Sequence, residues 1–222
     1  SMPSLSVVMI VRNEAARLPA CLESIRPIAD ELVIADTGST DGSFELARAC
    51  GAVTFAIPWR DDFAEARNQA LVAASGDWLL HIDADEVLDP PSAAQDGAIA
   101  DADGTPGGPG AQGMQRADAI EVTLANYCND IRAWRWTPAA PGDPMAKGFA
   151  GYIRVGLLRL FRNHKGYEYR EPVHENITES VLERGGVIRA EPITIHHYGY
   201  AASPEEAAAK ARFYLEIARR KA

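Results

Sequence analysis

The sequence is short of cysteine, of long apolar runs and of positive charge, and each shortage excludes a class of protein. Its three cysteines, Cys21, Cys50 and Cys128, form neither a Cys-x-x-Cys metal pair nor an even-numbered disulfide framework. We therefore expect a reducing, cytoplasmic setting. The sequence has no run of roughly eighteen apolar residues and no basic-then-apolar leader, so we predict neither a transmembrane segment nor a signal peptide.

Acidic residues outnumber basic ones by 31 to 22, which gives a net charge of −9. A field of that sign repels polyanions, so we expect no nucleic-acid partner and no general anionic-membrane surface. The usual backbone cradles for phosphate are missing as well, because residues 37–42 (TGSTDG) match neither G-x-G-x-x-G nor G-x-x-x-x-G-K-[ST]. An anionic ligand would then have to be bound by a metal ion and by side chains.

What the sequence does contain is an alternation of strand and helix patterns in its first half. A length of 222 residues with 47% hydrophobic residues allows one sizeable core. Apolar runs predict strands at 5–11, 31–35, 53–57 and 78–82, and apolar residues three and four apart predict helices at 14–25, 43–50 and 63–75. Asn13 is expected to cap the first helix. This alternation indicates an α/β fold with a parallel sheet.

Polar residues follow three of these strands at the point where each strand ends. They are Arg12, Asn13 and Glu14 after the first strand, Asp36 and Asp41 after the second, and Asp83 and Asp85 after the fourth. Carboxyl ends of parallel strands share one edge of the sheet, where α/β proteins bind ligands. The last two carboxylates suit one hard divalent cation that also binds phosphate oxygens. The alternative is that each cluster only caps a helix.

The second half of the chain is less regular. Residues 92–118 are rich in alanine, glycine, proline and aspartate, which predicts a flexible insertion. Strand patterns resume at 119–126 and 156–161, and residues 187–197 alternate strand-like segments with turns. Ser203, followed by Pro204 and Glu206, forms the start signal of a final helix. This charged helix reaches the last residue, so we expect the native protein to continue further.

Several motifs resemble those of the family 2 glycosyltransferases. The stronger ones are VMIVRNE at 8–14, ADTGSTDG at 35–42, ARNQAL at 66–71 and DADE at 83–86, and the weaker ones are RLFRN at 159–163, PVHE at 172–175 and HYG at 197–199. The resemblance implies a single GT-A domain, in which a Rossmann-like, mostly parallel sheet is flanked by helices and joined to a smaller mixed acceptor-side region. The expected parts are a nucleotide-sugar-binding half at 5–88, the insertion at 92–118, an acceptor half at 119–200 and a C-terminal helix at 203–222.

The resemblance also assigns donor-binding roles. Arg12, Asn13, Glu14 and Asp36 would bind the nucleotide-diphosphate sugar, in particular its nucleoside. Arg67 would lie near the base or the phosphates of the donor. A purely structural alternative for Arg67 is an ion pair on its own helix face.

A divalent cation, Mn²⁺ or Mg²⁺, is the implied cofactor. Asp85 would bind it, and Asp83 would lie beside the ribose or the metal. His197 resembles the C-terminal histidine that completes the metal shell in some GT-A enzymes. His196 is its rival, because adjacent strand residues point to opposite faces. An imidazole ligand favours manganese over magnesium.

The implied activity is transfer of a sugar, with inversion, from a nucleotide-diphosphate donor to a hydroxyl acceptor. A UDP-sugar is the favoured donor, and a glycan or lipid-linked acceptor of the cell envelope is the expected partner, reached from the cytoplasm or from the inner membrane face. The acceptor hydroxyl needs a general base. Glu171, His174 and Glu175 are the candidates, and we favour Glu175.

The sequence departs from better-known members of the family, because it has no Gln-x-x-Arg-Trp motif and no clear Glu-Asp pair in the acceptor half. This leaves a second hypothesis open, a non-catalytic nucleotide-sugar or glycan-binding module on the same fold. A third hypothesis is a nucleotidyltransferase. That class would be expected to carry a glycine-rich loop after the first strand, and residues 11–14 (VRNE) contain no glycine.

Overall fold

The computed structural model describes residues 3–90, 116–199 and 204–221. Its strands are β1 (Leu5–Val11), β2 (Glu31–Asp36), β3 (Val53–Ala56), β4 (Trp78–His81), β5 (Glu86–Leu88), β6 (Ala119–Cys128), β7 (Trp136–Pro138), β8 (Gly151–Arg162) and β9 (Ile188–His197). Its helices are α1 (Leu18–Ile25), α2 (Ser43–Ala49), α3 (Phe63–Val72), the 3-10 helix η1 (Pro144–Ala146), α6 (Thr178–Glu183) and α7 (Pro204–Lys221). Most of the predicted insertion at 92–118 and the predicted cap Ser203 lie outside the described residues.

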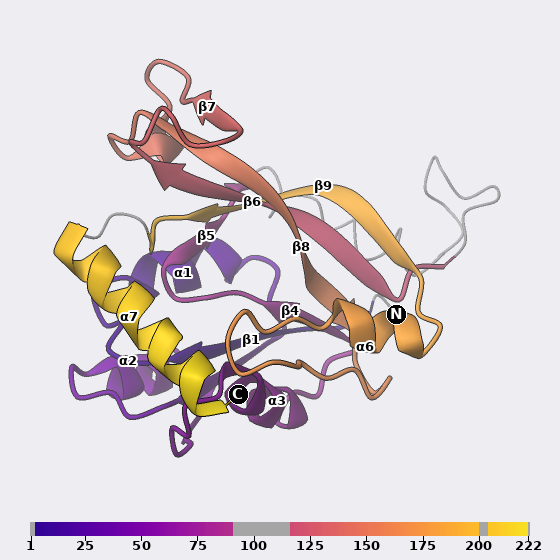
Figure 1. Cartoon of the computed structure of the whole chain (residues 1–222). Helices are drawn as coiled ribbons and strands as arrows, with labels where there is room; N and C mark the ends of the chain where they lie inside the picture. The colour runs from indigo at the N-terminus through magenta and orange to yellow at the C-terminus, as the bar shows by residue number, and fades with distance from the viewer. Residues whose placement is uncertain (1–2, 91–115, 200–203, 222) are drawn as a thin grey trace.

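The described strands form one sheet in the order β3-β2-β1-β4-β8-β6-β9-β5, with β7 paired to β8. The first four strands run parallel to one another, as predicted. Beyond β4 the pairing becomes antiparallel at β8 and β6, and β9 then runs parallel to β6. Figure 1 shows this second part of the sheet extending away from the strands β1 and β4. The predicted α/β fold, with a parallel first half and a mixed second half, is confirmed.

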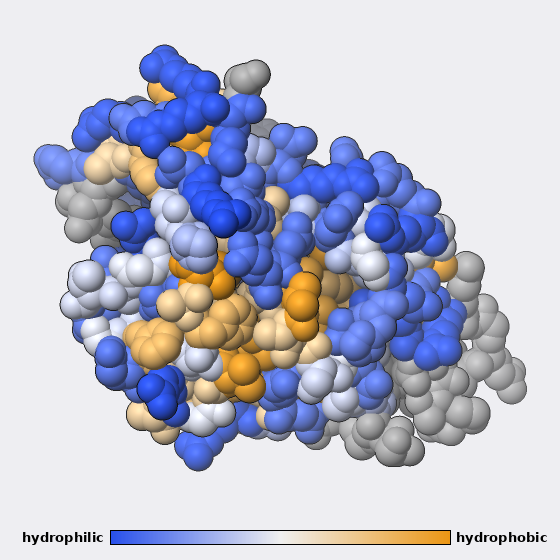
Figure 2. All heavy atoms as spheres, turned by 90° about the horizontal axis from the view of Figure 1, so that it is seen from below, coloured by the Kyte–Doolittle hydropathy of each residue, from blue (hydrophilic) through white to orange (hydrophobic). Residues whose placement is uncertain are grey.

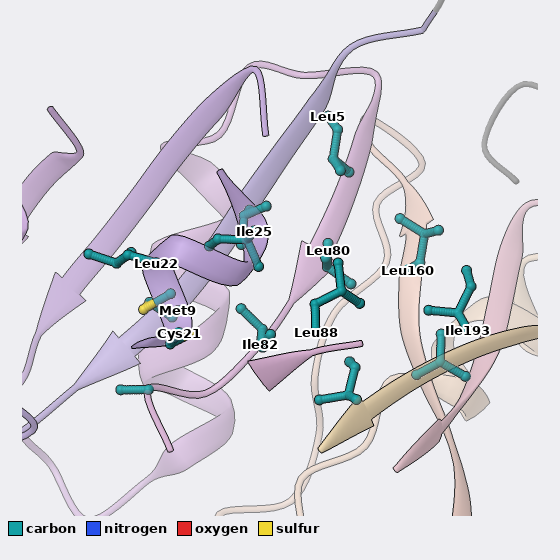
Figure 3. Close-up of a cluster of buried hydrophobic side chains, with 14 of the residues drawn as sticks. Leu5, Met9, Cys21, Leu22, Ile25, Leu80, Ile82, Leu88, Leu160 and Ile193 are labelled. Atoms are coloured by element: carbon teal, nitrogen blue, oxygen red, sulfur yellow. The ribbon is translucent and has the colours of Figure 1, made fainter. Parts of the chain in front are cut away.

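Alternation along β1 explains why helices cover both faces of the parallel strands. Leu5 and Met9 pack in one apolar cluster with Cys21, Leu22 and Ile25 of α1, as Figure 3 shows. Val8, which points the other way, packs in a second cluster with Ala64, Ala66 and Ala70 of α3. Successive side chains of a strand point to opposite faces, so one apolar strand serves two cores. The carboxyl edge of the sheet is left open between these two layers.

The first helix starts later than the sequence pattern predicted. It begins at Leu18, and the turn before it is closed by hydrogen bonds from the N–H groups of Arg17 and Leu18 to the carbonyl of Glu14. Pro19 lies in the first turn of the helix. Because proline has no N–H, an earlier start would have lost a helical hydrogen bond at that residue. The prediction that Asn13 caps this helix is therefore wrong.

Long-range pairing changes the boundaries in the second half. β8 begins at Gly151, before the predicted start at 156, because it pairs along its length with β6. β5 was not predicted, since its three residues are too few to show a pattern, and it exists by pairing with the end of β9. The segment 187–197, which the pattern divides by turns, forms the single strand β9.

The surface is largely polar. Figure 2 shows one face, which is mostly hydrophilic, with apolar residues gathered near its middle. Val72, at the end of α3, is the most exposed large apolar side chain of the described residues. Within the described ranges, no helix combines the length and the apolar character that crossing a membrane would require.

Candidate functional site

A cavity of about 410 Å³ opens at the carboxyl edge of the parallel strands. Arg12 and Glu14 line it from the end of β1, Thr37 from the end of β2, and Asp83 and Asp85 from the end of β4. These residues are far apart in sequence and meet here because their strands are parallel neighbours. Burial, and next the charge of Asp85, raise the pKa of Glu14. The cavity is therefore a place where carboxylates repel one another and a cation is favoured.

Two of the predicted donor-binding residues, Asn13 and Asp36, hold the loops that follow β1 and β2 and are not among the residues that line the cavity. Asn13 has a positive φ of 56°, and its Oδ1 accepts a hydrogen bond from the N–H of Thr40 at 2.8 Å. Asp36 accepts hydrogen bonds from the N–H groups of Gly38 and Ser39 through Oδ1. Its Oδ2 is buried and has no hydrogen-bond partner among the described residues. An orphaned buried carboxylate oxygen is costly, so it marks a place for a ligand donor.

Arg67 joins the two halves of the chain. Its Nε–H donates to Glu175 Oε1 at 2.7 Å, while its terminal nitrogens donate to Asp83 at 3.1 and 3.4 Å. The side chain is buried and lies over the ring of Tyr169. Burial opposes its charge, but the two carboxylates raise its pKa above the ordinary value. The structural alternative, an ion pair on the helix face, does not describe Arg67, because both of its described ion-pair partners, Asp83 and Glu175, come from outside α3.

Asp83 is held by a second neighbour, His81. The imidazole Nε2 lies 3.1 Å from Asp83 Oδ1, and Nδ1 lies 2.8 Å from the hydroxyl of Tyr169. Burial, and next the charges of Arg67 and Arg159, lower the pKa of His81 to about 3. The ring is therefore neutral, donating from Nε2 and accepting at Nδ1. Burial opposes ionisation of Asp83, but Arg67 and His81 outweigh it and hold the pKa of this carboxyl well below its usual value.

Asp85 meets His197 across the pairing of β5 with β9. His197 Nε2 lies 3.3 Å from Asp85 Oδ2, and His197 Nδ1 lies 2.7 Å from Asn126 Oδ1. Burial disfavours the charged imidazole, but Asp85 outweighs it and raises the pKa of His197. Gly199 leaves the space for this contact, because a Cβ there would come within 2.4 Å of His197 Nε2 and 2.8 Å of Asp85 Oδ2.

The rival histidine points elsewhere. His196 is buried between the hydroxyl of Tyr127 at 2.9 Å and Asp89 Oδ1 at 2.8 Å, and it does not line the cavity. Strand alternation separates the two rings, and the register of β9 puts His197 on the cavity side.

The donor set fits a divalent cation that is completed by its ligand. Asp85 offers a carboxylate oxygen and His197 an imidazole nitrogen, and Asn126 fixes the orientation of that ring from behind. Among the described residues, no group of three His, Cys, Asp or Glu side chains forms a complete metal site. Water and phosphate oxygens would have to supply the remaining coordination positions.

The three candidate bases lie in different surroundings. Glu175 lines the cavity with Oε1 bound to Arg67. His174 also lines it, has a positive φ of 60°, and lies beside the ring of Tyr214 at 6.3 Å between centroids. Glu171 is exposed and lies outside the cavity. Geometry therefore keeps Glu175 and His174 as groups that a ligand in the cavity would contact.

Sequence reasoning missed several residues of the site. Glu86 and Arg159 form a buried double hydrogen bond, at 2.9 and 3.0 Å, beneath the cavity. Burial raises the pKa of Glu86 and outweighs the opposing effect of Arg159. Trp59 and Phe63 line the cavity from the segment after β3, and α7 lines it through Lys210, Phe213 and Tyr214. Glu86 within DADE and Arg159 within RLFRN stood in motifs of the resemblance, but their contact with each other and the other contacts depend on tertiary packing.

Comparison with known proteins shows which family the first part of the chain is similar to. Residues 6–95 match the sequence model of glycosyl transferase family 2. An uncharacterized glycosyltransferase of Rickettsia bellii is 37% identical over 84 residues, which are 38% of this chain and 28% of that protein. A TPR repeat-containing protein of Synechococcus elongatus is 34% identical over 215 residues, which are 90% of this chain and 43% of that protein.

Solved structures show which fold the chain shares with known proteins. TarS of S. aureus aligns with a TM-score of 0.58 and 12% identity over 88% of this chain and 60% of the other. Glucosyl-3-phosphoglycerate synthase of Mycobacterium tuberculosis, solved with Mn²⁺, UDP and glucosyl-3-phosphoglycerate, aligns with a TM-score of 0.57 and 20% identity over 97% and 78%. These likenesses establish the GT-A fold. The chain spans less than half the length of the two curated relatives described above.

Proposed function

We propose that this chain is a family 2 glycosyltransferase. It transfers a sugar from a UDP-sugar to a hydroxyl of a glycan or lipid-linked acceptor, with inversion and with the help of a divalent cation. The observation that carries the proposal is the convergence of Asp85 and His197 with the Arg67–Asp83–Glu175 network around one cavity. The choice of uridine is supported by TarS and glucosyl-3-phosphoglycerate synthase, which were solved with UDP.

The nucleoside would bind at the ends of β1 and β2. Asp36 Oδ2 needs a hydrogen-bond donor, and a pyrimidine N–H is a suitable one. Val11, which pairs with Asp36 in the sheet, and Thr37 both line the cavity. A base in contact with Asp36 would therefore be joined to the rest of a nucleotide that is bound in the cavity. Arg12 would approach the same ligand from the rim.

The diphosphate would lie between this region and the pair Asp85 and His197. A divalent cation held there supplies Lewis-acid stabilisation of the negative charge that develops on the departing diphosphate. Asp83 contributes differently, because both of its oxygens accept hydrogen bonds from Arg67 or His81. It would orient the donor beside the metal while keeping Arg67 in position.

Glu175 is the proposed general base. Arg67 engages its Oε1, which leaves Oε2 to accept the proton of the acceptor hydroxyl. As that hydroxyl oxygen forms its bond to the anomeric carbon, the bond from this carbon to the diphosphate oxygen breaks on the opposite side. The proton stays on Glu175 and the electron pair leaves with the diphosphate.

The same ion pair favours the alternative, a nucleotide-sugar-binding module without transfer activity. The contact at 2.7 Å gives Glu175 a structural role, because it holds Arg67 in place without any transfer of a proton. In that case the chain would bind the donor with the metal but would not turn it over.

Calorimetric titration with UDP, GDP and their common sugar conjugates, with and without Mn²⁺, tests the proposal. We expect metal-dependent binding of the uridine nucleotides, and loss of that metal dependence in Asp85→Ala. The matched control is Asp130→Ala, which removes an exposed carboxylate outside the cavity. Product analysis with the sugar conjugate then separates transfer from binding. Failure of the folded chain to bind any of these nucleotides would contradict the proposal.

A further inference from the structure

The C-terminal helix α7 forms one wall of the cavity. Lys210, Phe213 and Tyr214 line it together with the strand-end residues. Their spacing of three and four residues puts them on one face of the helix. Figure 1 shows α7 running across the front of the molecule, past α2 and the end of β1 toward α3. The helix therefore turns the face that carries these three residues toward the cavity.

Aromatic contacts hold this face in place. Phe213 stacks with Trp59 at 6.3 Å between ring centroids, and Tyr214 meets the edge of Phe63 at 5.6 Å. One turn further on, Ile217 is buried with 1% of its surface exposed. Burial of apolar side chains in this way stabilises the docking more than exposed ion pairs do. The helix is thus anchored at the segment that follows β3.

Ion pairs fix the end of α7 on the same segment. Arg220 contacts Asp61 at 2.8 Å, and Lys221 contacts Asp62 at 3.5 Å. Asp62 is also the N-cap of α3, the helix that carries Arg67. The end of α7 and the start of α3 therefore share one attachment point.

The cavity needs a cation of the kind that Lys210 provides. Its two buried guanidinium groups are already engaged, Arg67 by Asp83 and Glu175 and Arg159 by Glu86. Lys210 is exposed, its Nζ lies over the ring of Tyr214 at 5.9 Å from the centroid, and it makes no salt bridge within the described part of the chain. A free ammonium group at the wall of a cavity rich in carboxylates is positioned for an anionic ligand rather than for the fold.

We propose that α7 completes the donor site and that Lys210 binds the diphosphate of the nucleotide. This inference rests on the proposed function, since it names a further binding residue of the same site. The ammonium group would contact the phosphate oxygens from the wall of the cavity that α7 forms. It would add a charge-assisted hydrogen bond to the charge neutralisation that a divalent cation provides.

Titration of Lys210→Met with UDP and with uridine, each in the presence of Mn²⁺, tests the inference. We expect UDP to bind about tenfold more weakly, because a hydrogen bond to a charged group is lost. Uridine, which has no phosphate, should bind as it does to the wild type. Lys210→Arg should restore most of the affinity for UDP, because it keeps the charge at that place.

The matched control is Arg212→Met, which removes a positive charge from an exposed position of the same helix outside the cavity. It should leave the affinity for UDP unchanged. Equal affinity of the wild type and Lys210→Met for UDP would overturn the role of Lys210 while leaving the proposed function intact. Absence of UDP binding by the wild type would overturn both. Thermal unfolding should show the same midpoint for all of these variants, since neither side chain makes a salt bridge among the described residues.

Discussion

The two halves of the chain reach the cavity by different routes. In the first half, Glu14, Asp83 and Asp85 directly follow strands, and parallel pairing brings their positions together. In the second half, Glu175 comes from an irregular segment, His197 from the end of β9, and Lys210 from a helix that docks on the site. The first arrangement binds ligands as α/β sheets generally do, whereas the second depends on tertiary contacts between distant segments.

Arg67 links these two arrangements. It stands on a helix of the first half and pairs with Asp83 of the same half and Glu175 of the other. The donor side and the proposed acceptor side therefore share one buried charge. Substitutions on the two sides of Arg67 should therefore separate binding of the donor from transfer of the sugar.

The largest effect is expected for Glu175→Gln. If Glu175 is the base of the second half, turnover of the UDP-sugar should fall at least ~100-fold. The affinity for UDP with Mn²⁺ should change little, because the donor groups of the first half are untouched. Release of UDP from the bound donor, measured with an acceptor or with water, checks this.

Glu171→Gln is the matched control, since it makes the same change four residues away and outside the cavity. It should keep wild-type turnover. Equal turnover in the two variants would remove Glu175 from its role and favour the binding-module alternative.

The first half was the easier one to predict from sequence. Its strands are continuous apolar runs, and the position of Asp83 and Asp85 after such a run predicts their edge of the sheet. These features are local, so they can be recognised in a single sequence. The start of α1 is the exception, because Pro19 has no N–H to donate and the helix begins only at Leu18.

The second half could not be predicted to the same depth. Alternation shows that His196 and His197 point apart, but the choice between them depends on the register of β9 against β5. Likewise, the buried pair of Glu86 and Arg159 joins residues that are 73 positions apart. The wall formed by α7 depends on ring contacts with Trp59 and Phe63. No local sequence pattern predicts such contacts between residues that are far apart in the chain.

The next effect is the loss of stability in Arg67→Met. Removal of the guanidinium leaves two carboxylates facing each other in a largely buried place, which we expect to cost up to about 3 kcal/mol of unfolding free energy. The estimate is below that of a fully buried pair because the Asp83 side chain keeps 31% of its surface exposed. Urea denaturation at neutral pH measures it. A double variant with Glu175→Gln should recover part of the loss, and full additivity would argue against the link between the halves.

A smaller effect is expected for Asn126→Ala, which tests how the second half orients its metal ligand. Asn126 holds His197 Nδ1 at 2.7 Å, and loss of such an outer contact typically lowers metal affinity by about tenfold or more. Mn²⁺ binding in the presence of UDP, followed by electron paramagnetic resonance, measures the free ion directly. Thr123→Ala, on the same strand, serves as the control. Unchanged Mn²⁺ affinity in Asn126→Ala would show that the ring is fixed by other contacts.

The smallest effect is expected for a change of stability at Glu31, which lies at the edge of the parallel strands away from the cavity. Burial opposes ionisation of Glu31, but hydrogen bonds from Ser6 and from the backbone and side chain of Ser75 outweigh it and lower its pKa. A carboxyl whose pKa is lower in the folded state stabilises the fold above its unfolded pKa of ~4.3, and this contribution is lost as the pH falls. Glu31→Gln should therefore cost about 1 kcal/mol or less at pH 7 in urea denaturation, and less still at pH 3. UDP affinity should not change, because this edge supports the strands without contributing to the cavity; a change would show that the two edges of the parallel half are coupled.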